Sequence, residues 1–191
     1  MSKQERATRT RNALILSAAE LFDQHGYVRT SLDEISTRAG VSRGALHFHF
    51  ANKAALAHAV EQAAADTLQT HATQLPLPHT NALQHLMNLT HQMIHLLHHD
   101  TIVRAGFRLN CDTTPQTPHD LRRQWHTCVH QLVTRATREH ALPIHINPDA
   151  LTTTIVATTT GLEILSRTHP QWLTPTTLTH IWQLLLPATA H

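Results

Sequence analysis

Several side chains between Thr30 and Lys53 are of the types that bind DNA. Arg43 can donate hydrogen bonds to a guanine edge or to a phosphate. Ser42 and its neighbouring backbone N–H groups suit a phosphate, and Gly44 lets the backbone approach a duplex closely. We therefore predict DNA contacts from eight residues of this segment: Thr30, Ser31, Ser42, Arg43, Gly44, His47, His49 and Lys53.

Two short helices joined by a tight turn are expected to position these side chains. Ser31 and Glu34 have the spacing of a capping box, which starts the first helix. Gly40 lies where the backbone must leave that helix, and Ser42 is a candidate N-cap for the second. This is the layout of a helix-turn-helix, whose second helix lies in the DNA major groove. The alternative is a generic helical hairpin, but caps, turn and apolar spacing agree along the whole segment.

The remainder of the chain also has the periodicity of helices. Apolar residues recur at helical spacing, and we recognise no strand and no internal repeat among the 191 residues. The first 58 residues carry eight Lys and Arg against five Asp and Glu, which suits a surface that faces phosphates. The sequence predicts an all-α fold with a DNA-binding domain at residues 1–52. A larger helical domain is predicted at residues 53–191, beginning with a long helix from Lys53 toward Leu68.

Motifs for other chemistry are missing from the sequence. There is no P-loop, dinucleotide-binding fingerprint or G-x-S-x-G element, so we expect neither an enzyme nor a cofactor. There is no signal segment and no apolar run of about 18 residues, so we expect a cytoplasmic protein without a membrane partner. The helical spacing of His91, His95 and His99 could hold zinc, but no Cys or carboxylate cluster completes a ligand set. We predict no metal site, and a metal-dependent enzyme remains an alternative.

The segment FDQHGYVRTSLDEISTRAGVSRGALHFHFANKAAL resembles the N-terminal signature of TetR-type repressors. It carries the F-x-x-x-G-Y and G-A-L-x-F-H-F-x-x-K elements where that family has them. The resemblance implies a helical homodimer whose two helix-turn-helix heads bind an inverted-repeat operator in double-stranded DNA. One departure is His47, which stands where the family usually carries a Tyr that contacts the DNA backbone. A histidine can also donate to phosphate, in a manner that depends on pH.

Three shorter motifs in the C-terminal half resemble the γ-butyrolactone autoregulator receptors of actinomycetes. They are V-R-A-G-F-R-L at residues 103–109, T-G-L-E-I-L-S at 160–166 and I-W-Q-L-L-L-P at 181–187. By this resemblance Trp125 lines a butyrolactone pocket, Thr160 hydrogen-bonds the ligand and Gln62 contacts it from the helix that begins at Lys53. The implied function is repression that ends when a small, largely apolar signalling molecule binds. The alternative is a TetR-type repressor that responds to another effector, such as an antibiotic or a biosynthetic intermediate.

The candidate ligand residues also have plain structural interpretations. An indole offers a flat wall and one N–H donor to a lactone, but Trp125 could equally be packed in the core. The Thr160 hydroxyl could bond back to its own helix. Arg104 and Arg108 could attract a carboxylated ligand, although we favour solvation or pairing with nearby aspartates, Asp100 and Asp112.

The dimer interface is expected on the last two helices, over residues 149–167 and 176–188. Pairs of helices from two copies would form a four-helix contact there. Trp172 and Trp182 are the candidate aromatic residues of that contact.

Overall fold

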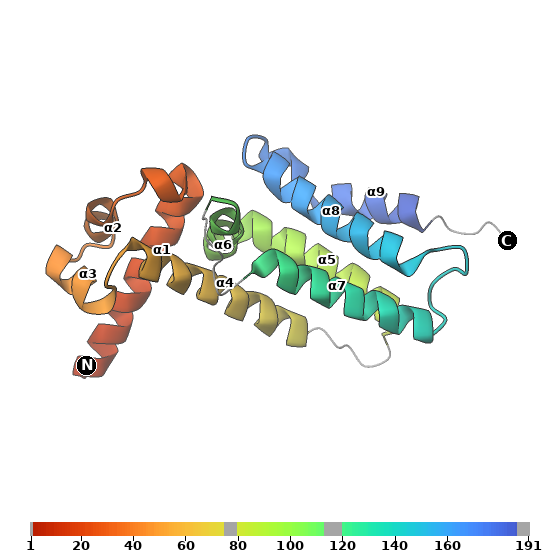
Figure 1. Ribbon diagram of the computed structural model, residues 1–191, viewed down its shortest axis with the longest axis horizontal. Helices are drawn as coiled ribbons and strands as arrows, with labels where there is room; N and C mark the ends of the chain where they lie inside the picture. The colour runs from red at the N-terminus through yellow and green to blue at the C-terminus, as the bar shows by residue number, and fades with distance from the viewer. Residues whose placement is uncertain (1, 75–79, 113–119, 187–191) are drawn as a thin grey trace. The chain divides into compact units, whose positions relative to one another are not determined.

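The computed structural model describes residues 2–74, 80–112 and 120–186, and all regular elements in these ranges are helical (Figure 1). The all-α fold expected from the sequence is confirmed. The α-helices are α1 Lys3–Arg29, α2 Leu32–Arg38, α3 Arg43–His49, α4 Lys53–Gln74, α5 Ala82–His99, α6 Thr101–Asp112, α7 Leu121–Arg138, α8 Pro148–Ser166 and α9 Pro175–Leu185. A short 3₁₀ helix, η1, covers Pro170–Trp172.

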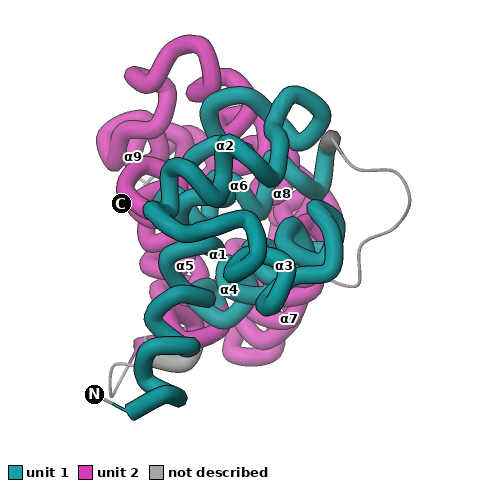
Figure 2. Tube along the Cα trace, turned by 90° about the vertical axis from the view of Figure 1, so that its left-hand side faces the viewer, with its two compact units in different colours: residues 1–68, 101–121 teal, residues 69–100, 122–191 magenta. Residues whose placement is uncertain are grey.

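The chain forms two compact units, which Figure 2 shows in different colours. The first comprises residues 1–68 and 101–121, and the second comprises residues 69–100 and 122–191. Packing therefore groups α6 with the N-terminal helices, although α6 follows α5 in the chain. These packing units do not coincide with the predicted functional division between residues 52 and 53, which stays a prediction.

Side-chain caps fix where several helices begin. Ser31 and Glu34 form the expected capping box, with the Ser31 Oγ accepting from the Glu34 N–H and the Glu34 carboxylate accepting from the Ser31 N–H. Ser42 caps α3, and the Asn52 Oδ1 accepts from the Ala55 N–H at 2.8 Å at the start of α4. Such caps satisfy backbone N–H groups that have no partner inside the helix.

The core of the first unit is built on the apolar face of α1. Leu14, Ala18 and Phe22 are fully buried there. They pack in one cluster with Ile35 of α2 and Leu46 of α3. Helices as short as α2 and α3 are not stable alone in water, so they depend on burial of this cluster against α1.

Gly26 interrupts α1 three residues before the helix ends at Arg29. Its φ of 79° and ψ of 167° are non-helical, and a further turn follows as far as Arg29. The positive φ is a conformation that glycine adopts without steric cost. This interruption sets the direction in which the chain enters the link to α2.

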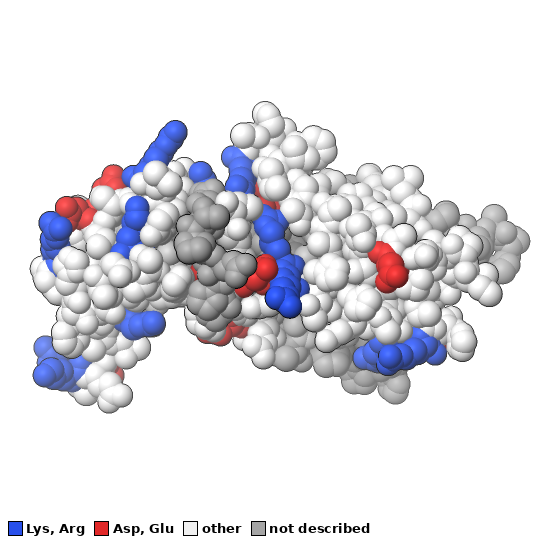
Figure 3. Space-filling view, viewed as in Figure 1, with Lys and Arg blue, Asp and Glu red and all other residues white. Residues whose placement is uncertain are grey.

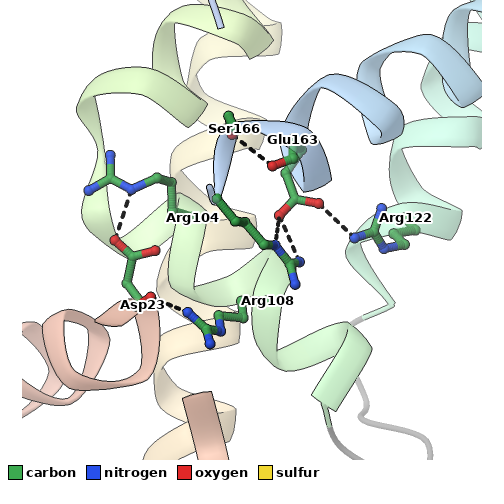
Figure 4. Close-up of polar contacts among 7 residues, drawn as sticks. Asp23, Arg104, Arg108, Arg122, Glu163 and Ser166 are labelled. Carbon is green, nitrogen blue, oxygen red and sulfur yellow. Dashed lines mark hydrogen bonds and ion pairs between the residues drawn. The ribbon is translucent and has the colours of Figure 1, made fainter. Parts of the chain in front are cut away.

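Helix α6 is fastened to α1 by two arginines. The Arg104 Nε donates to the Asp23 carboxylate at 2.9 Å, and Arg108 donates to the Asp23 backbone carbonyl (Figure 4). We favoured solvation or pairing with Asp100 or Asp112, and the Asp112 side chain lies outside the described residues. Asp23, which lies 81 positions from Arg104 in the sequence, was not among the expected partners. The interpretation of the two arginines as structural residues holds, with a partner that spacing alone did not indicate.

Helix α6 also lies close to α4 in the first unit. A Cβ built on Gly106 would lie 2.7 Å from the Ala64 Cβ and 3.0 Å from the Leu121 Cδ1. The Asn110 Nδ2 donates to the Glu61 Oε1 at 2.8 Å, and the Asn110 Oδ1 accepts from the Leu121 N–H at 2.7 Å. The glycine therefore permits a contact between α4 and α6 that a larger residue would prevent.

The second unit contains two buried tryptophan–threonine hydrogen bonds. The Trp125 indole N–H donates to the Thr159 hydroxyl at 2.9 Å, and the Trp182 indole N–H donates to the Thr90 hydroxyl at the same distance. Trp182 is 3% exposed, so its predicted place in a dimer interface is wrong. Trp182 instead joins α9 to α5 within one chain.

A buried carboxylate joins α7 to α8 in the same unit. Glu163 accepts from the Arg122 Nη2 at 2.9 Å and from the Arg167 Nη2 at 2.8 Å (Figure 4). Its side chain is 6% exposed. Burying a carboxylate without a partner would be costly, and the two arginine side chains offset that cost.

Candidate DNA interface and ligand-binding residues

The turn between α2 and α3 has the geometry of a helix-turn-helix. Gly40 has a φ of 66°, and the Val41 N–H donates to the Ser36 carbonyl at 3.0 Å, which closes the end of α2. The Ser42 Oγ then accepts from the Ala45 N–H and starts α3. The predicted motif is therefore present with its turn and both caps.

Helix α3 has a buried face and an exposed face. Leu46 is fully buried, and Phe50, which ends the helix, is 4% exposed. The opposite face consists of exposed residues: Ser42, Arg43, Gly44, His47 and Phe48. The side chains that hold α3 on the unit thus differ from those that it presents to solvent.

Arg43 makes a weak contact on this exposed face. Its Nη1 lies 3.3 Å from the Asp33 Oδ1, with the two side chains 67% and 65% exposed. Such an exposed ion pair contributes little to stability. Arg43 can therefore exchange Asp33 for a phosphate or a guanine edge at small cost. In Figure 3, blue and red side chains both occur over the part of the surface formed by the N-terminal helices.

Ser31 is occupied by its own helix. Its hydroxyl donates to the Glu34 Oε2 at 2.7 Å, and the two hydrogen bonds from Ser31 lower the pKa of the Glu34 carboxyl below its ordinary value. A phosphate contact by the Ser31 hydroxyl would have to replace the bond to Glu34.

Thr30 has a structural place that the sequence interpretation did not foresee. The side chain is buried at 2% exposure, and its hydroxyl lies 2.9 Å from the Gly26 carbonyl and 3.3 Å from the Leu21 carbonyl. We expected this hydroxyl to bind phosphate, but it closes the end of α1. The correction follows from burial, which the position of Thr30 before a cap did not reveal.

Lys53 also binds the end of α1. Its ammonium donates to the Tyr27 and Thr30 carbonyls, each at 2.9 Å, and lies 4.4 Å from the centre of the Tyr27 ring. A cation at a helix C-terminus is favourable because carbonyls there lack helical partners. Lys53 therefore ties the first turn of α4 to α1.

The two histidines of α3 differ in their surroundings. His47 is exposed, whereas His49 is half-buried between two phenylalanines. The His49 ring centre lies 5.2 Å from that of Phe48, in an edge-to-face arrangement, and 6.5 Å from that of Phe50. His47 thus belongs to the exposed face, and His49 packs beside it.

Similarity to known proteins covers both halves of this arrangement. Residues 14–60 match the family of bacterial regulatory proteins of the tetR type, and residues 80–190 match the tetracyclin repressor-like C-terminal domain. The chain belongs to the TetR family of bacterial regulatory proteins. Members of this family are transcriptional regulators and not enzymes.

The relatives of this TetR-family regulator include butyrolactone receptors. The A-factor receptor protein of Streptomyces griseus is 31% identical over the whole chain, which spans 67% of that protein. The crystal structure of a gamma-butyrolactone receptor described as ArpA-like is 33% identical, with a TM-score of 0.83 over 96% of this chain and 89% of that one. CprB from Streptomyces coelicolor, solved with its biological operator sequence, is 33% identical with a TM-score of 0.79 over the same shares of the two chains.

The three candidate ligand residues of this TetR-family regulator are divided between the two units, each of which is described by itself. Trp125 is 6% exposed, and its N–H is bonded to Thr159. Thr160, the expected ligand partner, is half-buried one position away and makes no contact with the indole in the hydrogen bonds described. Gln62 belongs to the first unit, is exposed, and donates to the Asp66 Oδ1 at 2.8 Å. The sequence interpretation selected Thr160 and did not identify Thr159 as the hydrogen-bond partner of the Trp125 indole.

A small apolar cavity lies within the second unit. It has a volume of about 10 Å³ and is lined by residues of α5, α8 and α9, including Thr90, Thr159 and Trp182. This is room for about one water molecule and far below the volume of a ligand pocket. The cavity is therefore a packing gap between the two tryptophan–threonine bonds.

The histidines of α5 are engaged in other contacts. The His91 Nδ1 lies 2.8 Å from the Met87 carbonyl, and its Nε2 lies 3.2 Å from the Thr179 hydroxyl. In the described ranges, no group of three His, Cys, Asp or Glu side chains is arranged to hold a metal ion. Within the same ranges, no helix is long and apolar enough to cross a membrane.

Proposed function

We propose that this TetR-family regulator is a repressor that binds an inverted-repeat operator as a homodimer and leaves it when a γ-butyrolactone-type molecule binds. The observation that carries the proposal is the similarity to butyrolactone receptors along the whole chain, including a relative solved with its operator. In this proposal the exposed face of α3 would be the surface that reads DNA. Its place of action would be the cytoplasm, where the operator is.

The proposed DNA-contact residues differ in whether their side chains are exposed or already bonded within the first unit. Arg43, Gly44 and His47 lie on the exposed face of α3, and Arg43 is held only by an exposed ion pair. Ser31 and Ser42 would contact phosphate at the starts of α2 and α3, as predicted. Lys53 and His49 would act mainly by holding the ends of α1 and α3 in place. The Thr30 side chain is not proposed as a contact.

Exposed apolar side chains support a dimer through the C-terminal helices. Ile164 and Leu165 of α8 are 46% and 45% exposed, and Leu184 of α9 is 81% exposed. Trp172 in η1 is 43% exposed and remains a candidate for the interface. Exposed apolar side chains on the surface of a soluble domain are typical of association surfaces. Two heads related by the two-fold axis of a dimer would read two half-sites, so the proposed operator is an inverted repeat.

Helix α4 is the proposed route from ligand to DNA. It starts at Lys53, whose ammonium is bonded to α1, and the chain passes into the second unit within this same helix. A ligand that favours one of two positions of α4 would change the separation of the two α3 helices in a dimer. Trp125 and Thr160 are kept as proposed ligand contacts, with Gln62 on α4 as a third.

The test uses the full-length chain and a duplex that it enriches from a random pool. We expect a symmetric duplex to be retained at moderate salt and to be released by a γ-butyrolactone at a stoichiometry of one per chain. Trp125→Ala should bind the same duplex but require more ligand for release. Specific DNA binding that resists a butyrolactone panel yet yields to antibiotics or their intermediates would establish the alternative effector class. Absence of any enriched duplex would overturn the proposal itself.

A further inference from the structure

Phe48 is an aromatic side chain that the fold of the first unit leaves uncovered. It is 80% exposed, although it lies two residues before the buried Phe50. In the described part of the first unit, the other phenylalanines and the tyrosine, Phe22, Phe50, Phe107 and Tyr27, are buried or half-buried. Core packing therefore does not explain the presence of a phenylalanine at position 48.

The surroundings of Phe48 leave its ring open on the side that α3 presents to solvent. A helical side chain leans toward the preceding turn, and the turn that precedes Phe48 contains Gly44, which has no side chain to cover the ring. A Cβ built on Gly44 meets no heavy atom nearer than the Ser42 Oγ at 4.0 Å. On the other side, the edge-to-face contact with His49, at 5.2 Å between ring centres, steadies the Phe48 ring.

Polar neighbours restrict what the ring can meet. Arg43 and His47, which share the exposed face of α3, are suited to phosphates and base edges rather than to an apolar protein surface. The major groove combines such polar groups with one apolar group, the C5-methyl of thymine. An exposed apolar ring on the same short helix as these polar side chains therefore fits a thymine methyl.

We infer that Phe48 reads a thymine methyl group in each operator half-site and so sets the base preference at that position. The inference rests on the proposed function, because it requires α3 to lie in the major groove. It adds a specificity-determining residue that is absent from the predicted contacts. A contact of this kind distinguishes thymine from uracil, which differs only by the methyl group.

Uracil substitution tests the inference on the duplex that the wild-type chain enriches. Each thymine is replaced by uracil at symmetric positions of both half-sites, one position at a time. We expect one position at which wild-type affinity falls by about 15-fold, since each lost methyl contact is worth about 4-fold. Phe48→Ala should bind the thymine duplex more weakly and lose no further affinity upon uracil substitution at that position.

Leu16→Ala is the matched control. It removes a 47% exposed apolar side chain from α1 of the same unit and should keep the uracil response of the wild type. In sedimentation, Phe48→Ala should have the same oligomeric state as the wild type. A changed oligomeric state would show that Phe48 contacts a second copy of the chain, and it would overturn the inference.

Two further outcomes distinguish failure of methyl recognition by Phe48 from failure of the proposed repressor function. If a duplex is enriched but tolerates uracil at every thymine, or if Phe48→Ala keeps the wild-type response to uracil, methyl recognition is wrong while repression stands. If the wild-type chain enriches no duplex, the proposed function fails, and the inference fails with it.

Discussion

Asp23 on α1 binds Arg104 on α6 through a hydrogen bond of 2.9 Å from the arginine Nε to the carboxylate. The two side chains are 23% and 30% exposed, so the ion pair is only partly screened by water. We expect Asp23→Asn to lower the free energy of unfolding by about 1–3 kcal/mol, measured by urea denaturation. The control is Asp33→Asn in the exposed pair with Arg43, which should change that free energy by less than about 1 kcal/mol. Equal losses in the two variants would contradict the assigned role of Asp23.

Gly106 and Ala64 should behave as a size-matched pair. Gly106→Ala would place a methyl group 2.7 Å from the Ala64 Cβ, and neither atom can rotate away. We expect this overpacking to destabilise the protein by about 1–3 kcal/mol despite the better helix propensity of alanine. The double variant Gly106→Ala with Ala64→Gly should recover most of the loss, because it restores the space between α4 and α6. Thermal unfolding of the two single variants and the double variant measures this; an additive double variant would refute the close contact.

The hydrogen bond between Trp125 and Thr159 should give a measurable coupling energy. Thr159→Val keeps the side-chain shape but leaves the buried indole N–H without its acceptor, which should cost about 1–3 kcal/mol. Trp125→Phe removes the donor, so the double variant should lose less stability than the sum of the single variants. A double-mutant cycle of unfolding free energies tests this. Additivity would show that the bond does not contribute.

His85 should make stability depend on pH. Burial, and then the charge of Arg135, lower the pKa of the His85 imidazole below its ordinary value of 6.5. Its Nε2 is buried and has no hydrogen-bond partner among the described residues. The unfolded chain therefore takes up a proton first as the pH falls below 6.5, so the stability contributed by neutral His85 is complete above 6.5 and is lost toward the lower folded pKa.

The comparison is between the wild type and His85→Gln, in urea denaturation from about pH 7.5 to about pH 5. We expect the wild type to lose more stability over this range than the variant. Parallel curves would mean that His85 titrates alike in the folded and unfolded states.

Ile164 should be needed for association of two chains. It is 46% exposed on α8, so a carboxylate at this position can reach water. We expect Ile164→Glu to keep its helical circular dichroism, sediment as a monomer and bind a single half-site only weakly. The control is Ile144→Glu, which alters a fully exposed side chain between α7 and α8 and should leave the dimer intact. A dimeric Ile164→Glu would place the interface elsewhere.

Local sequence signals predicted the helix-turn-helix well. The capping box of Ser31 and Glu34, the turn at Gly40 and the cap at Ser42 each depend on residues within a few positions of one another. Hydrogen bonds of this kind form wherever their short sequence occurs at a helix end. Spacing alone was therefore sufficient for them.

Partners distant in the sequence could not be predicted in the same way. Arg104 finds Asp23 across 81 positions, and the Trp125 indole finds Thr159 rather than the neighbouring Thr160. A shift of one residue along a helix turns a side chain by about 100°, which sequence resemblance across short motifs does not resolve. Burial of Thr30 and Trp182 likewise depends on how helices pack, and it removed both from the surfaces first assigned to them.

The three tryptophans, at positions 125, 172 and 182, all belong to the second unit. Trp125 and Trp182 are buried with bonded N–H groups, whereas Trp172 is 43% exposed. Intrinsic emission therefore reports on the proposed ligand-binding half, and acrylamide should quench the Trp172 component selectively. A fluorophore on the operator adds a second colour that follows the N-terminal half. A single sample can thus report ligand binding and DNA release as separate optical signals. The delay between the two signals would give the rate at which ligand binding leads to DNA release.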